Sequence, residues 1–183
     1  NLPIRRIEVK SRRGHAMAKY YQYYVEGQDE EKLIQVLKTE LRLIEPGKVE
    51  KFNVVSEELT KLRIMSLKMG TIVVLVFDTD AGNINTLKKN IKFLKEQKAI
   101  KNVLCITQVK NLEDELKRSC DIKDVKELTG SKSNSDFKHD IRKEKQFGKK
   151  LLKKGFDIKK FWAQTDNYIY KEISNDANEI KKL

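Results

Sequence analysis

The chain has 183 residues, of which 39 are Lys or Arg and 27 are Asp or Glu, giving a formal net charge of +12. This length allows one domain with a buried core, or one domain with short appendages. The most apolar run, residues 71–77, has the length of a strand and not of a membrane span, and residues 1–10 lack a signal-peptide pattern. We therefore expect a soluble, cytoplasmic protein with no membrane partner.

The first half of the chain predicts a strand followed by a helix. Residues 1–19 are basic and show no sustained period, so they form an arm or the cut edge of a longer protein. Residues 20–25 are aromatic and β-branched and end at Glu26 and Gly27, which predicts a strand and a tight turn. Apolar residues at helical spacing then predict a helix from Asp29, its N-cap, to Ile44, before Pro46 and Gly47.

The same alternation continues up to residue 107. Strands are predicted at residues 49–56, 71–77 and 101–107, with helices at residues 57–68 and 83–94. The continuous apolar run at residues 71–77 is typical of a strand that is buried on both faces of a parallel sheet. Four β-α repeats predict an α/β fold, a three-layer open sheet of about four parallel strands.

Beyond residue 110 the chain is expected to be helical. Helices are predicted at residues 111–120 and 136–154, with a Gly/Ser-rich loop at residues 129–135 between them. Residues 156–183 carry apolar side chains that can pack a further helix against the domain, and Trp162 is expected in the core or at a partner contact. The expected organisation is a basic arm (residues 1–19), an α/β domain (20–110) and a helical, basic C-terminal extension packed on it (111–183).

The positive charge is clustered. Residues 1–25 hold six basic residues and one acidic residue, and residues 132–160 hold eleven basic and four acidic ones. Such clusters favour a polyanion such as DNA or RNA, because neutralised phosphates release counterions, although Lys-rich faces can also be merely solvated. The candidate nucleic-acid-binding residues are Arg12, Arg13, Lys138, Arg142, Lys143, Lys149 and Lys150.

Carboxylates follow two of the predicted strands. Glu26 comes after the first, and Asp78 and Asp80 come after the third. Functional groups of open α/β sheets gather at the carboxyl ends of strands, so these side chains meet if the two strands are neighbours. Their repulsion, on the order of a few kcal/mol per pair at about 4 Å, is removed by a divalent cation. Mg²⁺, with Mn²⁺ as a substitute, suits such oxygen ligands and would orient a phosphate and activate water.

Other kinds of site are less well supported by the residues. The two cysteines, Cys105 and Cys120, and the distant His15 and His139 favour neither a disulfide framework nor a zinc site. A D-x-D motif after a strand also occurs in receiver domains, phosphatases and sugar transferases, or serves only to cap a helix. The D-x-D motif together with Glu26 at the end of another strand indicates a metal site more strongly than the motif alone.

The residues that carry this combination resemble a known superfamily. V-E-G at residues 25–27, followed about fifty residues later by V-F-D-T-D-A-G at residues 76–82, resembles the TOPRIM superfamily over residues 20–110. The resemblance implies a four-stranded parallel sheet in which Glu26, Asp78 and Asp80 bind Mg²⁺, with Glu26 as a general acid or base. Topoisomerase and primase branches need further domains, so the small nucleases of the overcoming-lysogenization-defect and RloB-like kind fit best.

Those nucleases carry an additional acidic motif, which residues 111–116 resemble. Glu113 or Glu115 would then complete a second metal position about 4 Å from the first, or else these acids only occupy the first turn of a helix capped by Asn111. Asp29 and Glu30 pose the same choice, and capping is the better interpretation. Lys132 and Lys138 are candidates for contacting the scissile phosphate, Lys132 as a catalytic residue.

The leading hypothesis is a Mg²⁺-dependent endonuclease that hydrolyses DNA or RNA, as a prokaryotic anti-phage defence effector. The rival is a nucleic-acid-binding or assembly module that does not cut. A third possibility is a subunit that an ATPase partner activates, since the chain has no G-x-x-x-x-G-K-[ST] loop of its own. The oligomeric state is left open, with a homodimer as one possibility.

Overall fold

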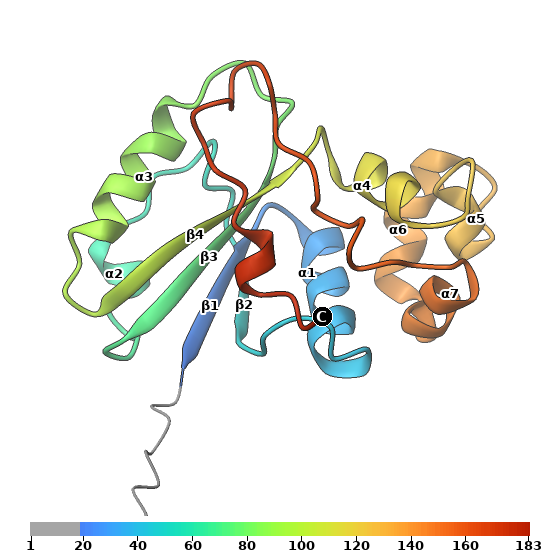
Figure 1. Ribbon diagram of the computed structural model, residues 1–183, viewed down its shortest axis with the longest axis horizontal. Coiled ribbons are helices and arrows are strands. Elements are labelled where there is room, and N and C mark those ends of the chain that lie inside the picture. The colour runs from blue at the N-terminus through green and yellow to red at the C-terminus, as the bar shows by residue number, and fades with distance from the viewer. Residues whose placement is uncertain (1–18) are drawn as a thin grey trace, which may run out of the picture.

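The computed structural model describes residues 19–183 of the chain, so the predicted arm, with Arg12 and Arg13, lies almost entirely outside the described residues. Four strands form one parallel sheet in the order β2-β1-β3-β4. They are β1 (Tyr20–Val25), β2 (Lys48–Lys51), β3 (Thr71–Asp78) and β4 (Ile100–Gln108). Helices lie on both sides of the sheet (Figure 1), which confirms the predicted three-layer α/β fold.

Alternate residues of each strand face two separate cores, as the pleat of a strand requires. One core contains Tyr23 and Val74 and is closed by α1 (Gln28–Gln35), its π-helical continuation η1 (Val36–Glu40) and the C-terminal helices. The other contains Tyr24 and Leu75 and is closed by α2 (Lys61–Ile64) and α3 (Asn85–Lys95). The C-terminal helices are α4 (Leu112–Ser119), α5 (Lys126–Thr129), α6 (Asn134–Lys143) and α7 (Phe147–Lys153).

Strand β3 lies between β1 and β4 in the sheet, and all its residues from Thr71 to Phe77 are buried. This burial confirms the interpretation of the apolar run. Val25 at the end of β1 pairs with Val76 of β3, so the two segments that bear Glu26 and Asp78 leave the same edge of the sheet side by side.

The segment between β1 and β3 differs from the prediction at its boundaries. The first helix begins at Gln28 with Gly27 as its N-cap, so Asp29 is not the cap, and the helical conformation ends by Arg42, at φ 52°. The expected strand at residues 49–56 stops at Lys51, and the expected helix at residues 57–68 shrinks to α2. The cause is Asn90 of α3, whose buried amide binds the backbone of Val54, Glu57 and Leu59 and holds residues 54–59 in an irregular loop.

The C-terminal extension also departs from the prediction. The helix expected at residues 136–154 is divided into α6 and α7, because Glu144 adopts an extended conformation and its carboxylate accepts hydrogen bonds from the Gln146 backbone and Lys150. Residues 156–183 do not form the expected helix, and their helical part is the short 3-10 turn η2 (Ala177–Glu179). Trp162 is nevertheless buried, as predicted for a core residue.

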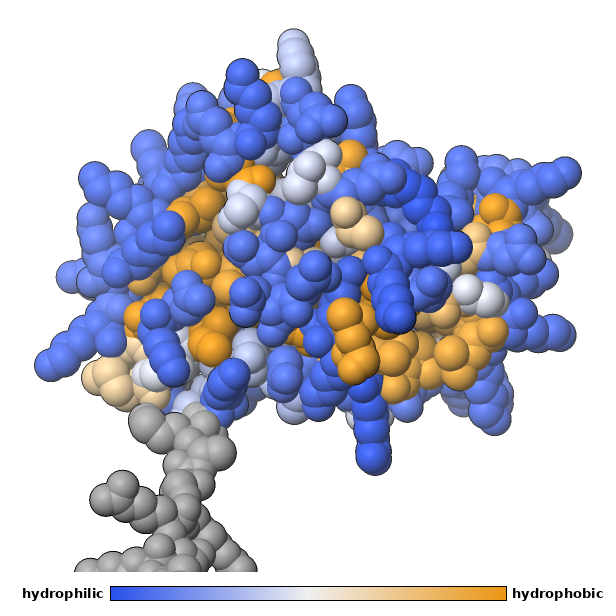
Figure 2. Space-filling model, viewed as in Figure 1, coloured by the Kyte–Doolittle hydropathy of each residue, from blue (hydrophilic) through white to orange (hydrophobic). Residues whose placement is uncertain are grey.

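This irregular segment runs along the sheet beside β4 (Figure 1). Asp176 binds Cys105 of β4 twice, accepting from its backbone N–H at 2.8 Å and donating to its carbonyl at 2.7 Å. The segment therefore supplies hydrogen-bond partners for backbone groups on the open edge of the sheet. On the face shown in Figure 2 the surface is largely hydrophilic, with smaller apolar areas between the charged side chains. No helix within residues 19–183 has the length and apolar character needed to cross a membrane.

Candidate acidic site

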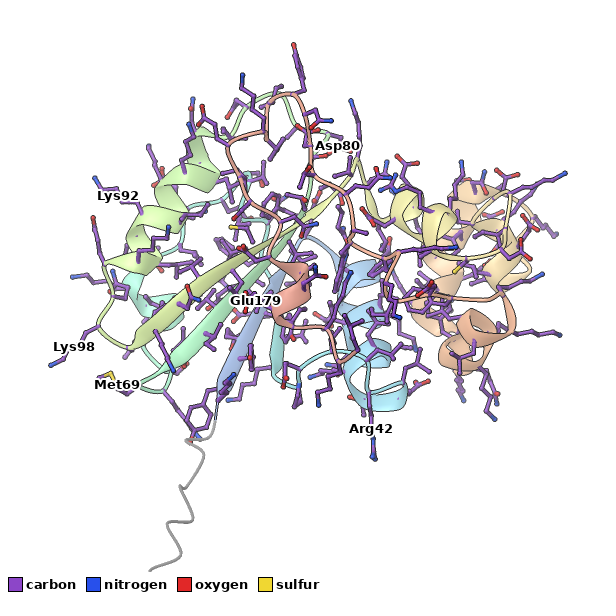
Figure 3. All side chains as sticks on the ribbon, viewed as in Figure 1. Arg42, Met69, Asp80, Lys92, Lys98 and Glu179 are labelled. Carbon is purple, nitrogen blue, oxygen red and sulfur yellow. The ribbon has the colours of Figure 1, made fainter. Side chains whose placement is uncertain are left out.

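Acidic side chains meet where β1 and β3 end. Glu26 follows β1, Asp78 is the last residue of β3 and Asp80 comes two residues later. The backbone N–H of Asp78 donates to Oε2 of Glu26 at 3.3 Å, which joins the two strand ends directly. Figure 3 shows Asp80 at this edge of the sheet, above the ends of β3 and β4.

Thr79 anchors the backbone between Asp78 and Asp80. It is buried, and its backbone N–H donates to the carbonyls of Gln108 and Lys110 at 3.1 and 2.9 Å. These two hydrogen bonds hold the chain that follows β3 against the end of β4. Asp78 and Asp80, on either side of Thr79, both line the same hollow of the surface.

Crowding of the carboxylates changes their protonation. Burial, with the negative charges of Glu26 and Glu30, raises the pKa of Asp78 to about 9. Burial and the charges of Glu26 and Asp29 raise the pKa of Glu30 to about 7, and burial also raises the pKa of Glu26. Glu30, expected to act at the helix start, is thus a member of the acidic cluster.

A hollow of about 400 Å³ opens beside this cluster, and its lining includes Asp78, Asp80, Glu113 and Lys138. Nζ of Lys138 lies 3.3 Å from Oε1 of Glu113. The charge of Glu113, followed by those of Asp29 and Asp78, raises the pKa of Lys138. The hollow therefore combines carboxylates with two lysines, Lys117 and Lys138, and Lys138 is the one that pairs with an acid of the hollow.

The two acids proposed for a second metal position lie in different surroundings. Glu113 lines the hollow. Glu115 is fully buried, and its oxygens accept hydrogen bonds from the backbone of Val109 and Trp162 and from Arg118. Between the two alternatives the geometry favours Glu113, because the carboxylate of Glu115 is already engaged in holding α4 to β4 and the C-terminal segment. Asn111 caps α4, accepting from the Asp114 backbone N–H at 2.9 Å, as expected.

Three residues near the cluster were missed from the sequence. Nε2 of Gln108, at the end of β4, donates to Oδ1 of Asp78 at 2.7 Å, and Oε1 of Gln108 accepts from the Trp162 indole at 3.2 Å. Tyr170 stacks on Phe77, and its buried hydroxyl has no hydrogen-bond partner among the described residues. Burial and the charges of Asp80 and Glu26 raise the pKa of Tyr170 to about 12. No sequence motif marks these residues. Trp162 and Tyr170 lie in a segment without regular secondary structure, so no periodic pattern indicates that they pack against the sheet.

The candidate phosphate contacts are spread over the C-terminal helices. Arg142 of α6 pairs with Asp29 at 2.8 Å, and Lys150 pairs with Glu144 at 2.7 Å. Lys143 and Lys149 are exposed. Lys132 is exposed in the loop before α6 and is not among the residues that line the hollow. Lys138, which lies within α6, does line it.

A larger hollow, of about 590 Å³, lies at the opposite edge of the sheet, where Tyr20, Gly47 and Thr71 mark the starts of the strands or the approach to them. None of the clustered carboxylates is among the residues that line it. We therefore place the candidate site at the smaller hollow, on the basis of its chemistry.

The donor set fits a hard divalent cation in its chemistry but is not preformed. Within residues 19–183, no three His, Cys, Asp or Glu side chains are arranged to hold a metal ion. The groups are nevertheless carboxylates, the ligands that Mg²⁺ prefers, and burial together with mutual repulsion raises the pKa values of Asp78 and Glu30. Asp80 is exposed, so its side chain is free to turn toward Glu26 and Asp78.

Comparison with known proteins gives no family assignment. No protein-family model, no curated protein and no solved structure matches the chain.

Proposed function

We propose that this protein is a metal-dependent endonuclease that hydrolyses phosphodiester bonds of DNA or RNA at the acidic site. The observation that carries the proposal is the meeting of Glu26 and Asp78 at adjacent strand ends, joined by the 3.3 Å hydrogen bond, with Asp80 beside them. Buried like charges are unfavourable unless something compensates them. A divalent cation is the compensation that this donor set fits best.

The residues around the site have separable roles in this proposal. Glu26, Asp78 and Asp80 would hold the cation, with Glu113 available for a second one. Bound Mg²⁺ would neutralise the carboxylates, orient the phosphate and lower the pKa of a water molecule. Lys138 lines the same hollow and would contact a phosphate oxygen, where a fixed cation stabilises the charge that develops during cleavage.

Alanine substitutions at the D-T-D segment test this proposal. Asp78→Ala and Asp80→Ala are expected to abolish Mg²⁺-dependent cleavage of nucleic acid while the chain stays folded by circular dichroism. Glu96→Ala is the matched control, because Glu96 is an exposed acid at the other end of α3, and it should cleave at the wild-type rate. Undiminished cleavage by either aspartate variant would rule out the proposed site.

A second candidate function is a nucleic-acid-binding or assembly module that does not cut. It is favoured by the lack of a preformed set of three metal ligands among residues 19–183. In that case nucleic-acid binding would persist in EDTA, and neither Mg²⁺ nor Mn²⁺ would support cleavage of any substrate.

A further inference from the structure

A chain of two hydrogen bonds leads from the C-terminal segment to Asp78. The Trp162 indole N–H donates to Oε1 of Gln108, and Nε2 of Gln108 donates to Oδ1 of Asp78 at 2.7 Å. Gln108 and Trp162 are 0% and 1% exposed. A buried amide that is bonded at both ends cannot turn over without losing both bonds. The indole therefore determines which end of the amide faces Asp78.

Trp162 is itself held from three sides. Its backbone N–H donates to Oε2 of Glu115 at 2.8 Å, its carbonyl accepts from Nδ2 of Asn175 at 2.8 Å, and its ring packs against Phe161 with centroids 4.4 Å apart. Its φ of 54° lies in the left-handed region, which residues other than Gly adopt at a cost in free energy. These contacts hold the indole in one place, although the surrounding chain has no regular secondary structure.

We propose that Gln108 and Trp162 are positioning residues for Asp78, which hold one oxygen of its carboxylate so that the other is presented to a divalent cation. This inference rests on the proposed function, because it concerns the same site. Carboxylates that bind metals are commonly oriented by outer hydrogen bonds, and loss of such a partner typically weakens metal binding or activity by about 10- to 100-fold. The C-terminal segment would thereby contribute to the site without touching the substrate.

The direct test is a calorimetric titration of the full chain with Mn²⁺. Gln108→Leu removes both hydrogen bonds, and Trp162→Phe removes only the one from the indole N–H and keeps a smaller aromatic ring. Both variants are expected to bind Mn²⁺ more weakly, Gln108→Leu by about 10- to 100-fold. Asn90→Leu is the matched control, since Asn90 is also a buried amide with several hydrogen bonds, but it lies in α3 and binds residues 54–59. It should keep the wild-type affinity.

The single tryptophan supplies a second readout that does not depend on activity. Titration of the wild type with Mg²⁺ is expected to shift the emission of Trp162, and the same titration of Gln108→Leu should leave the emission unchanged. A substitution that only destabilised the fold would not separate the emission of Trp162 from metal binding. Asn90→Leu should therefore show the same shift in emission as the wild type.

The outcomes separate the two proposals. Wild-type Mn²⁺ affinity in both folded variants would overturn the positioning role and leave the nuclease proposal intact. Weakened affinity in the variants of a chain that cleaves no nucleic acid would support the positioning role and contradict the nuclease proposal. A wild-type chain that binds no Mn²⁺ would overturn both.

Discussion

Asp78 lies where the acidic cluster is most crowded, and its protonation should govern how stability changes with pH. Its pKa is raised to about 9 by burial and by Glu26 and Glu30, and the pKa of Glu30 is raised to about 7. Both values exceed the pKa of about 4 that these groups have in the unfolded chain. The folded state therefore binds more protons, and stability falls as pH rises between these limits. Thermal unfolding in EDTA should show this fall from pH 6 to pH 9, with a shallower slope for Asp78→Asn. An equally steep slope in that variant would contradict the raised pKa of Asp78.

Two lysines that the sequence does not distinguish are separated by the structure. Lys138 lines the hollow with Asp78 and Asp80, while Lys132 does not. If the site cleaves phosphodiesters, Lys138→Ala should lower kcat by about 10²- to 10³-fold, the usual loss when one electrostatic contact to the transition state is removed. Lys132→Ala is the matched comparison and should stay within a few-fold of the wild type. Equal losses in the two variants would remove Lys138 from the site.

At the scale of elements, the connection between η1 and β2 depends on one glycine. A Cβ atom added at Gly47 would collide with the backbone carbonyl and Cβ of Tyr21 in β1, whereas one added at Gly82 would meet open space. Gly47→Ala should therefore lower the free energy of unfolding by about 1–3 kcal/mol, as overpacking does, and Gly82→Ala should leave it nearly unchanged. Denaturant unfolding curves of the two variants would show the difference, and equal midpoints would contradict this packing.

The sequence predicts best those elements whose pattern is set by burial on the sheet. The run at residues 71–77 has the apolar continuity of a central strand, and the meeting of Glu26 with Asp78 follows once β1 and β3 are neighbours. It fails where one side chain overrides local preference, as Asn90 does for residues 54–59 and Glu144 does between α6 and α7. Gln108 and Trp162 had no signal, because their relation is a contact between residues 54 positions apart.

At the scale of the whole molecule, the sheet and the C-terminal extension form one body. The core on one face of the sheet includes Val74 of β3 together with Phe137, Phe161 and Ile180 from beyond residue 110. Arg142 of α6 also pairs with Asp29 of α1 at 2.8 Å. The extension is therefore part of the structure that shapes the acidic site, and its residues Glu113 and Lys138 line the hollow together with Asp78.

The central claim is that the acidic site supports metal-dependent hydrolysis of nucleic acid. Its most direct test is a cleavage assay of the purified wild-type chain on plasmid DNA, single-stranded DNA, total RNA and transfer RNA, with Mg²⁺, with Mn²⁺ and with EDTA. Cleavage of at least one of these substrates with metal, abolished by EDTA and by Asp78→Ala, is the predicted result. Cleavage that persists in EDTA, or intact substrates under every metal condition, would contradict the claim.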